Sequence, residues 1–271
     1  MTEVAQPAPG TPLILQARQD DVLTITLNRP DRLNALDHGL GRALVEALNH
    51  AAEDKSVRSV VLTGAGRSFC SGGDLYALRD IRERNAVQEF ESQLLLGKQI
   101  VLAIVKMSKP VLAAVNGPAM GAGCNLALAC GLRIASDNAM FAESFAKLGL
   151  FPDFGGTYFL ARIAGVAVAA EMLYTGEPIS AADAARVGLV SRVVPQERFS
   201  QEAAKMAIAL AVAPPVMVHG IKQMLFKDNL ADLERSLDEE IRWQLVCFRS
   251  DDFREGLEAF FEKRAPRFHG Q

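Results

Sequence analysis

Apolar and polar positions alternate in short segments along roughly the first 200 residues. In VLTITLN (22–28), Leu23, Ile25 and Leu27 alternate with threonines, which predicts a strand with one buried face. The unbroken apolar runs in VRSVVLTG and KPVLAAVNG predict strands that are covered on both faces. The segments IAS and AMFAE predict two further short strands.

Segments whose apolar residues have helical spacing lie between these predicted strands. Asp37 is placed to cap a helix whose apolar face runs from Leu40 to Leu48. Residues 87–107 and 121–130 also repeat their apolar positions with a helical period. Strands that alternate with helices predict an α/β core with mainly parallel strands and crossover helices.

The pattern changes near the end of this core. Ser180 and Asp183 form a capping pattern, and the helix that follows is expected to stop at Gly188, ahead of one more strand. Beyond that strand the spacing is helical throughout, with a break at Pro214-Pro215. We therefore expect a flexible leader over residues 1–10, a core over 11–197 and a helical region over 198–271.

Composition narrows the class of protein. The chain has 271 residues, of which 49% are hydrophobic and 23% charged, as in ordinary globular proteins. A net charge of −3 with scattered basic residues argues against a nucleic acid or a membrane as partner. No signal-peptide pattern is present, and the four cysteines form no C-x-x-C pair, so we expect reduced thiols, no metal site and a cytoplasmic location.

Three glycine-rich segments are candidate ligand loops: LTGAGRSFCSGGD (62–74), NGPAMGAGCN (116–125) and FGGT (154–157). The first lacks the third glycine of a dinucleotide-binding fingerprint, which disfavours nucleotide binding. The second joins a strand to a helix, whose free N–H groups suit stabilisation of an oxyanion. Close packing of that helix on the sheet is the alternative explanation.

Asp153 stands among apolar residues in KLGLFPDFGGTYFL. A buried carboxylate is costly unless it is paired or has a task. One interpretation is that Asp153 caps the helix that starts near Gly155. The other is that it acts as a general base whose pKa is raised by its apolar surroundings.

Five segments in order resemble the enoyl-CoA hydratase/isomerase (crotonase) superfamily: NRPDRLNAL, SFCSGGDL, KPVLAAVNGPAMGAGCNLALAC, LGLFPDFGGT and YTGEPISAADAARVGLVSRVV. The resemblance covers roughly residues 13–200, and the helical tail fits it. It implies a spiral of ββα repeats with a C-terminal helical region that builds homotrimers or hexamers. It also implies an acyl-CoA substrate, with coenzyme A as part of that substrate and no separate cofactor.

The same resemblance assigns site residues. The oxyanion hole would be the N–H groups of Gly73 and Ala122. The two glutamates of the family's hydratases correspond to Asn125 and Phe145, and Glu143 would replace the second only after a register shift. The base that some isomerases carry before the GG-T turn corresponds to Asp153. This arrangement looks most like the 1,2-epoxyphenylacetyl-CoA isomerase subgroup.

Further residues are assigned by position in the family's motifs. Arg29, Arg32, Lys263 and Arg264 flank the site of the CoA phosphates in relatives, and the alternative for each is an ordinary surface charge. Asn125 would bind the substrate or a neighbouring group. Phe145 would shape the acyl pocket or belong to the core.

The resulting prediction is a CoA-thioester isomerase that acts on an epoxyphenylacetyl-CoA or a 3-enoyl-CoA, in fatty acid or phenylacetate metabolism. An enoyl-CoA hydratase that uses Glu143 is one alternative. A non-catalytic CoA-binding member of the family is another, because a fold does not fix a function. The resemblance also extends to dehalogenases, which use an aspartate at the place of Asp153 together with an upstream histidine. Because no histidine lies between residues 51 and 218, dehalogenation is disfavoured.

Overall fold

The main sheet has six strands in the order β1-β2-β3-β4-β6-β9. The computed structural model describes residues 11–226 and 230–270, so the expected leader over 1–10 lies outside the described residues. All neighbouring strands of this sheet are parallel except the antiparallel pair β1 and β2. The strands are β1 Ile14–Gln19, β2 Val22–Leu27, β3 Ser59–Gly64, β4 Val111–Val115, β6 Leu132–Ser136 and β9 Arg192–Val194.

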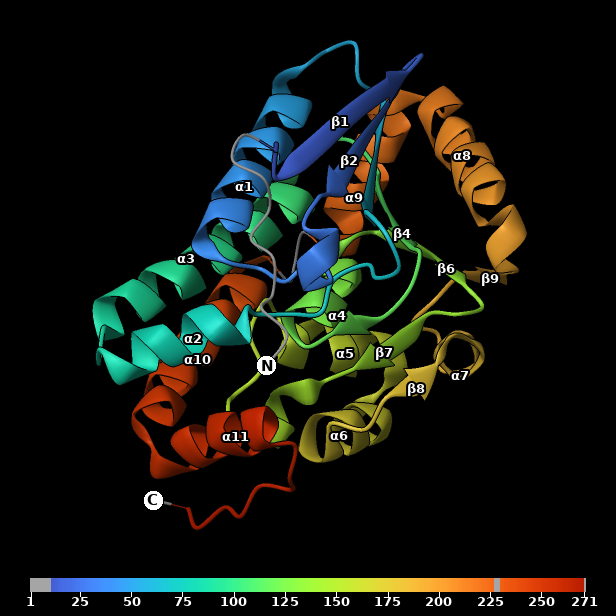
Figure 1. Cartoon of the computed structure of the whole chain (residues 1–271). Coiled ribbons are helices and arrows are strands. Elements are labelled where there is room, and N and C mark those ends of the chain that lie inside the picture. The colour runs from blue at the N-terminus through green and yellow to red at the C-terminus, as the bar shows by residue number, and fades with distance from the viewer. Residues whose placement is uncertain (1–10, 227–229, 271) are drawn as a thin grey trace.

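A second, three-stranded sheet is formed by β5 (Ala119–Met120), β7 (Met140–Ala142) and β8 (Ile179–Ser180). It lies beyond the ends of the main strands, where the chain leaves β4 toward β5 (Figure 1). Strand β7 pairs with β5 in parallel and with β8 antiparallel.

Helices connect and cover the strands. The two 3-10 helices are η1 (Pro30–Arg32) and η2 (Ser144–Leu148). The α-helices of the core are α1 His38–Glu53, α2 Leu75–Glu83, α3 Val87–Lys106, α4 Ala122–Ala129, α5 Gly156–Ala164, α6 Val166–Thr175 and α7 Ala181–Arg186. The C-terminal region contains α8 Gln196–Val212, α9 Pro215–Phe226, α10 Leu230–Arg249 and α11 Asp251–Glu262.

The two faces of the main sheet pack against different helices. On β3, Val60 and Leu62 join the large core with α1, α3 and α4, whereas Val61 faces α8. Figure 1 shows α8 on the opposite side of the sheet from α1 and α3. Burial on both faces explains why the central strand β4 is apolar at every position.

The fold class predicted from the sequence is confirmed, and two predicted helix caps are present in the structure. The Asp37 carboxylate accepts a hydrogen bond of 2.8 Å from the N–H of Leu40 at the start of α1. Ser180 caps α7, and Gly188 has a φ of 84° after that helix. Among the described residues, the tail is helical in α8, α9, α10 and α11, with its break before Pro215, and residues 265–270 are not helical.

Across the described ranges, no single helix is both long enough and apolar enough to span a membrane. Helices α8 and α9 reach the required length and apolarity only as a pair, which is bent by 102°.

Candidate active site

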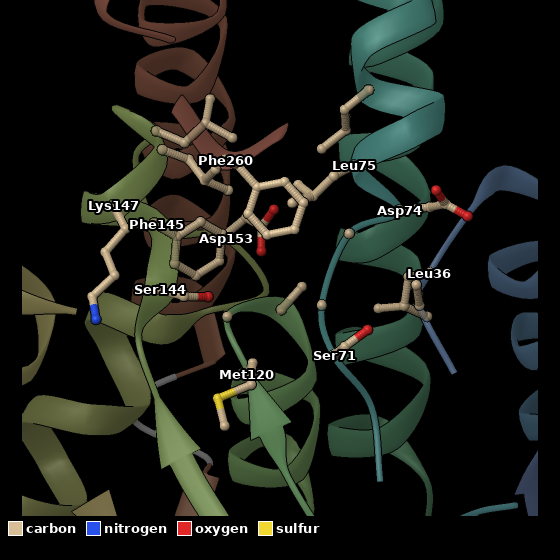
Figure 2. A pocket seen from close by; sticks show the side chains of 18 of the residues that line it. Leu36, Ser71, Asp74, Leu75, Met120, Ser144, Phe145, Lys147, Asp153 and Phe260 are labelled. Carbon is tan, nitrogen blue, oxygen red and sulfur yellow. The ribbon is translucent and has the colours of Figure 1, made fainter. Parts of the chain in front are cut away.

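A cavity of about 1110 Å³ opens between the glycine loops, η2, α3 and the C-terminal helices. Figure 2 shows Phe145, Asp153 and Phe260 on one side of this pocket, opposite Leu36 and Leu75. The wall is mostly apolar, so a thioester with a hydrocarbon or aromatic acyl group can be buried in it.

The first two glycine loops lie against each other at the base of the pocket. The N–H of Met120 donates a hydrogen bond of 2.9 Å to the carbonyl oxygen of Cys70. Gly72 has a φ of 92°, and a Cβ there would lie 2.8 Å from the carbonyl oxygen of Met120. A Cβ on Gly123 would lie 2.2 Å from the carbonyl oxygen of Cys70. Only glycine allows this close approach of the two backbones.

This contact places Gly73 and Ala122 among the residues that line the pocket. Neither N–H has an acceptor among the described residues. Ala122 is the first residue of α4, so its N–H is one of the free donors at a helix N-terminus, where the helix dipole favours negative charge. The pair can therefore bind an oxygen atom that becomes negatively charged.

Asp153 lines the same pocket, and Figure 2 shows it across from Leu36 and Leu75. Its Oδ2 accepts a hydrogen bond of 3.2 Å from Nε2 of Gln244, and its buried Oδ1 has no hydrogen-bond partner among the described residues. Loss of hydration raises the pKa of Asp153 well above its ordinary value. The negative charge of Glu240 adds to this rise, and the hydrogen bond from Gln244 opposes it.

The helix-capping interpretation of Asp153 is wrong. Its backbone carbonyl accepts from the N–H of Gly156, but its side chain does not cap α5. Glu240 of α10 takes this role, because its carboxylate accepts from the N–H groups of Gly155 at 2.8 Å and Thr157 at 3.0 Å. Burial raises the pKa of Glu240 to about 7, although the bonds from Thr157 and Gly155 oppose this. The Asp153 carboxyl is therefore left available to the pocket.

Glu143 is fully buried and is not among the residues that line the pocket. Strand β7 ends at Ala142, so Glu143 does not share a strand face with Phe145, as the register-shift hypothesis required. Phe145 lines the pocket instead. Burial raises the pKa of Glu143 to about 8, against the opposing hydrogen bonds from Cys124 and Asn125.

Asn125 binds neighbouring protein groups and does not line the pocket. Its Nδ2 donates to the carbonyl oxygen of Asp153 at 2.9 Å and to Oε2 of Glu143 at 3.2 Å. Of the two interpretations of Asn125, the structure favours the one in which it holds its surroundings in place.

The other carboxyl groups in the pocket wall differ from Asp153. Asp37 and Asp74 both pair with the guanidinium group of Arg29. Glu177 pairs with Lys147, and Asp31 is exposed to solvent. Asp153 is half-buried and forms no ion pair among the described residues, so no cation opposes the rise of its pKa that burial causes.

The four basic residues assigned to CoA lie in different settings. Arg32 and Arg264 line the pocket. The buried Nε and Nη1 atoms of Arg32 have no hydrogen-bond partner in the described chain, and its guanidinium group lies 4.8 Å from the centre of the Tyr76 ring. Arg29 is buried and is occupied by Ala35, Asp37 and Asp74, which does not favour a role in phosphate binding. Lys263 is exposed and lies outside the pocket wall.

Sequence reasoning missed the contribution of α10. Glu240 and Gln244 are 2% and 1% exposed, and they share a buried helix face with Leu233, Leu237 and Phe248. The spacing of these five positions was readable in the sequence, because polar residues on an apolar helix face need partners.

Comparison with known proteins places this site in a family. The sequence profile described as enoyl-CoA hydratase/isomerase matches residues 17–271. The chain is 38% identical to the 1,2-epoxyphenylacetyl-CoA isomerase of Escherichia coli (strain K12), over 95% of this chain and 98% of that protein. It is 40% identical to a probable enoyl-CoA hydratase of Rhodobacter capsulatus, over 93% and 96% of the two chains.

A solved structure shows the same fold. The enoyl-CoA hydratase from Mycobacterium avium subsp. paratuberculosis superposes with a TM-score of 0.86 at 34% identity, covering 95% of this chain and 99% of that one. The resemblance drawn from the motifs, including that to the epoxyphenylacetyl-CoA isomerase subgroup, is confirmed. The chain belongs to the enoyl-CoA hydratase/isomerase (crotonase) superfamily.

Proposed function

We propose that this protein is an acyl-CoA isomerase in which Asp153 moves a proton between two carbon atoms of the substrate. The observation that carries the proposal is the pocket that Asp153 shares with Gly73 and Ala122: of its lining carboxyl groups, Asp153 is the partly buried one without a cation partner among the described residues, whereas Asp31 is exposed and the others are paired. An isomerase needs one base and one oxyanion site, and this pocket has both.

For a 3-enoyl-CoA the steps are as follows. The Asp153 carboxylate takes a proton from C2, and the C–H electron pair forms a C1–C2 double bond while the thioester oxygen becomes negative. The N–H groups of Gly73 and Ala122 bind that oxygen. The protonated Asp153 then delivers the proton to C4, the oxygen regains its double bond to C1, and the product carries its double bond between C2 and C3.

The acyl group is proposed to be an epoxyphenylacetyl or 3-enoyl type. Support comes from the aromatic side chains in the wall, which include Phe90, Phe145 and Phe154, and from the similarity to the E. coli epoxyphenylacetyl-CoA isomerase. Coenzyme A is proposed to enter as part of the substrate, and Arg32 is the candidate for its phosphates, because it lines the pocket and has guanidinium nitrogens without a partner among the described residues. Arg264 also lines the pocket, but it pairs with Glu255 and Glu262.

The hydratase alternative has support from names of relatives but less from the geometry. Adding water needs one group to activate the water and one to protonate the α-carbon. Glu143 would have to be the second carboxyl, and it is buried outside the pocket wall. We therefore expect little hydration of a 2-enoyl-CoA.

The test is the fate of a 3-enoyl-CoA and a 2-enoyl-CoA in deuterated water, with wild type and Asp153→Asn side by side. We expect isomerisation of the 3-enoyl substrate with deuterium incorporation, and a loss of at least about 100-fold in the variant. Asp80→Asn, an exposed carboxyl on α2, is the control and should keep wild-type rates. Hydration that survives Asp153→Asn would refute the proposal, and CoA-ester binding without any turnover would favour a non-catalytic member.

We also propose the homotrimer or hexamer that the family implies. The outer faces of α8 and α9 carry exposed apolar side chains, including Val212, Val216, Ile221 and Met224. Sedimentation that shows only monomer at micromolar concentration would contradict this assembly.

A further inference from the structure

Two buried amide side chains each contact a buried carboxyl group beside the pocket. Gln244 on α10 donates from Nε2 to Oδ2 of Asp153 at 3.2 Å. Asn125 on α4 donates from Nδ2 to Oε2 of Glu143 at 3.2 Å. Gln244 is 1% exposed and also lines the pocket, whereas Asn125 does not. Gln244 is therefore the amide that is placed to act on the base.

In each pair, one carboxyl oxygen and the amide oxygen have no hydrogen-bond partner in the described part of the chain. Oδ1 of Asp153 and Oε1 of Gln244 are both buried and without a hydrogen-bond partner among the described residues. The same holds for Oε1 of Glu143 and Oδ1 of Asn125. Buried polar atoms without partners are rare, so each calls for an explanation. A proton on the carboxyl group provides the missing donor, because a neutral carboxylic acid donates one hydrogen bond and an amide oxygen can accept it.

An amide suits a group that gains and loses a proton. The terminal torsion of glutamine has two orientations of similar shape, which exchange the positions of Nε2 and Oε1. With Nε2 toward Asp153, Gln244 donates to the carboxylate. With Oε1 in that place, it accepts from the carboxylic acid. No other type of uncharged side chain of this length offers both a donor and an acceptor at its tip.

Helix α10 is joined to the Asp153 segment by a second side chain besides Gln244. Glu240 lies one helical turn before Gln244 on the same face and holds the N–H groups of Gly155 and Thr157, directly after Asp153. The backbone of the Asp153 segment is thus tied to α10 by Glu240, and its side chain is tied to the same helix by Gln244 (the Asp153 carboxyl is labelled in Figure 2).

We propose that Gln244 is a positioning residue that holds Asp153 in both of its protonation states, so that a proton taken from the substrate can be returned to it within one encounter. This inference rests on the proposed isomerase function for its catalytic part. It goes beyond that function by assigning a role to a side chain of the C-terminal helical region, which the reaction itself does not require to touch the substrate.

The experiment compares wild type, Gln244→Met and the control Gln99→Met, which replaces an exposed glutamine on α3 outside the pocket wall. Methionine fills a similar volume but cannot hydrogen-bond to a carboxylate. A hydrogen bond to the ionised carboxylate is stronger than one from the neutral acid, so losing both in Gln244→Met should move the ionisation of Asp153 upward, by about one pH unit. At a fixed pH of about 7 we expect kcat to fall by about 10- to 100-fold with little change in KM, because Gln244 does not bind the thioester.

Two readouts separate this inference from the proposed function. The first is the pH dependence of kcat for the 3-enoyl-CoA. The second needs no turnover: infrared difference spectra across pH, with Asp153→Asn to assign the band, follow the Asp153 carboxyl directly.

An Asp153 band that titrates at the same pH in wild type and in folded Gln244→Met would overturn the inference, whatever the activity. An upward shift in Gln244→Met but not in Gln99→Met supports it. If the band shifts but no variant, including wild type, isomerises or exchanges any substrate, the hydrogen-bond assignment stands and the proposed function fails.

Discussion

Glu143 is a buried carboxyl whose protonation should make the stability of this protein depend on pH. It is fully buried, and its hydrogen bonds come from Asn125 and Cys124. Burial raises its pKa from 4.5 to about 8. The unfolded chain loses this proton as the pH rises past 4.5, whereas the folded chain keeps it until about pH 8. The folded state binds more protons in this window, so the free energy of unfolding falls as the pH rises through it.

The size of the effect follows from these two values. Each pH unit between these two pKa values lowers the free energy of unfolding by ~1.4 kcal/mol. Between about pH 5.5 and about pH 8, wild type should therefore lose about 3 kcal/mol of stability from this group alone. The substitution Glu143→Gln is neutral at every pH and has nearly the same shape. Its NH₂ group supplies the donor that Oδ1 of Asn125 lacks among the described residues. The free energy of unfolding of the variant minus that of wild type should therefore increase by about 3 kcal/mol between about pH 5.5 and about pH 8.

The assay is urea unfolding at the two pH values, followed by the fluorescence of Trp243, the single tryptophan of the chain. The control is Glu177→Gln, because the Glu177 side chain is 69% exposed and pairs with Lys147 on the surface. Loss of that pair should change stability by about 0–1 kcal/mol with no growth across this window. A constant difference between wild type and Glu143→Gln at both pH values would show that folded Glu143 is already ionised, and would refute the reasoning.

Two further predictions concern the oxyanion site. Ala122→Pro removes one N–H at the first position of α4, so kcat for the 3-enoyl-CoA should fall by ~100-fold or more, and urea unfolding measures the cost of fitting the ring into this buried position. A wild-type kcat in that variant would exclude the Ala122 N–H from the reaction. Gly123→Ala places a Cβ 2.2 Å from the carbonyl oxygen of Cys70, so it should cost about 1–3 kcal/mol in urea unfolding and lower kcat as well. Full activity in a stably folded Gly123→Ala protein would show that the spacing of the two loops does not set the site.

A raised pKa also determines how activity depends on pH, but here the activity increases as the pH rises. Asp153 must be ionised to act as a base, and its pKa is raised, so kcat/KM should increase with pH well above the range of an ordinary aspartate. A profile that is already flat above about pH 5 would contradict a raised pKa for the base.

The sequence by itself determined the local structure. Alternation in VLTITL, the cap at Asp37 and the stop at Gly188 depend on neighbours along the chain, so their outcomes in β2, α1 and α7 could be predicted. The two glycine loops and Asp153 could be named as site candidates for a similar reason. Glycines between a strand and a helix, and an acid in an apolar segment, are visible without knowing what lies across the fold.

Only the tertiary structure decided how the site residues are used. Whether Asp153 caps α5 or faces the pocket depends on Glu240, which is far away in the sequence and takes the capping role. Arg29 was assigned to the CoA site, but its guanidinium group pairs with Asp37 and Asp74, which cap α1 and α2. Glu143 follows the last residue of β7 and does not line the pocket. Burial and the choice of partners are properties of packing between distant segments, and for that reason no pattern within one segment can fix them.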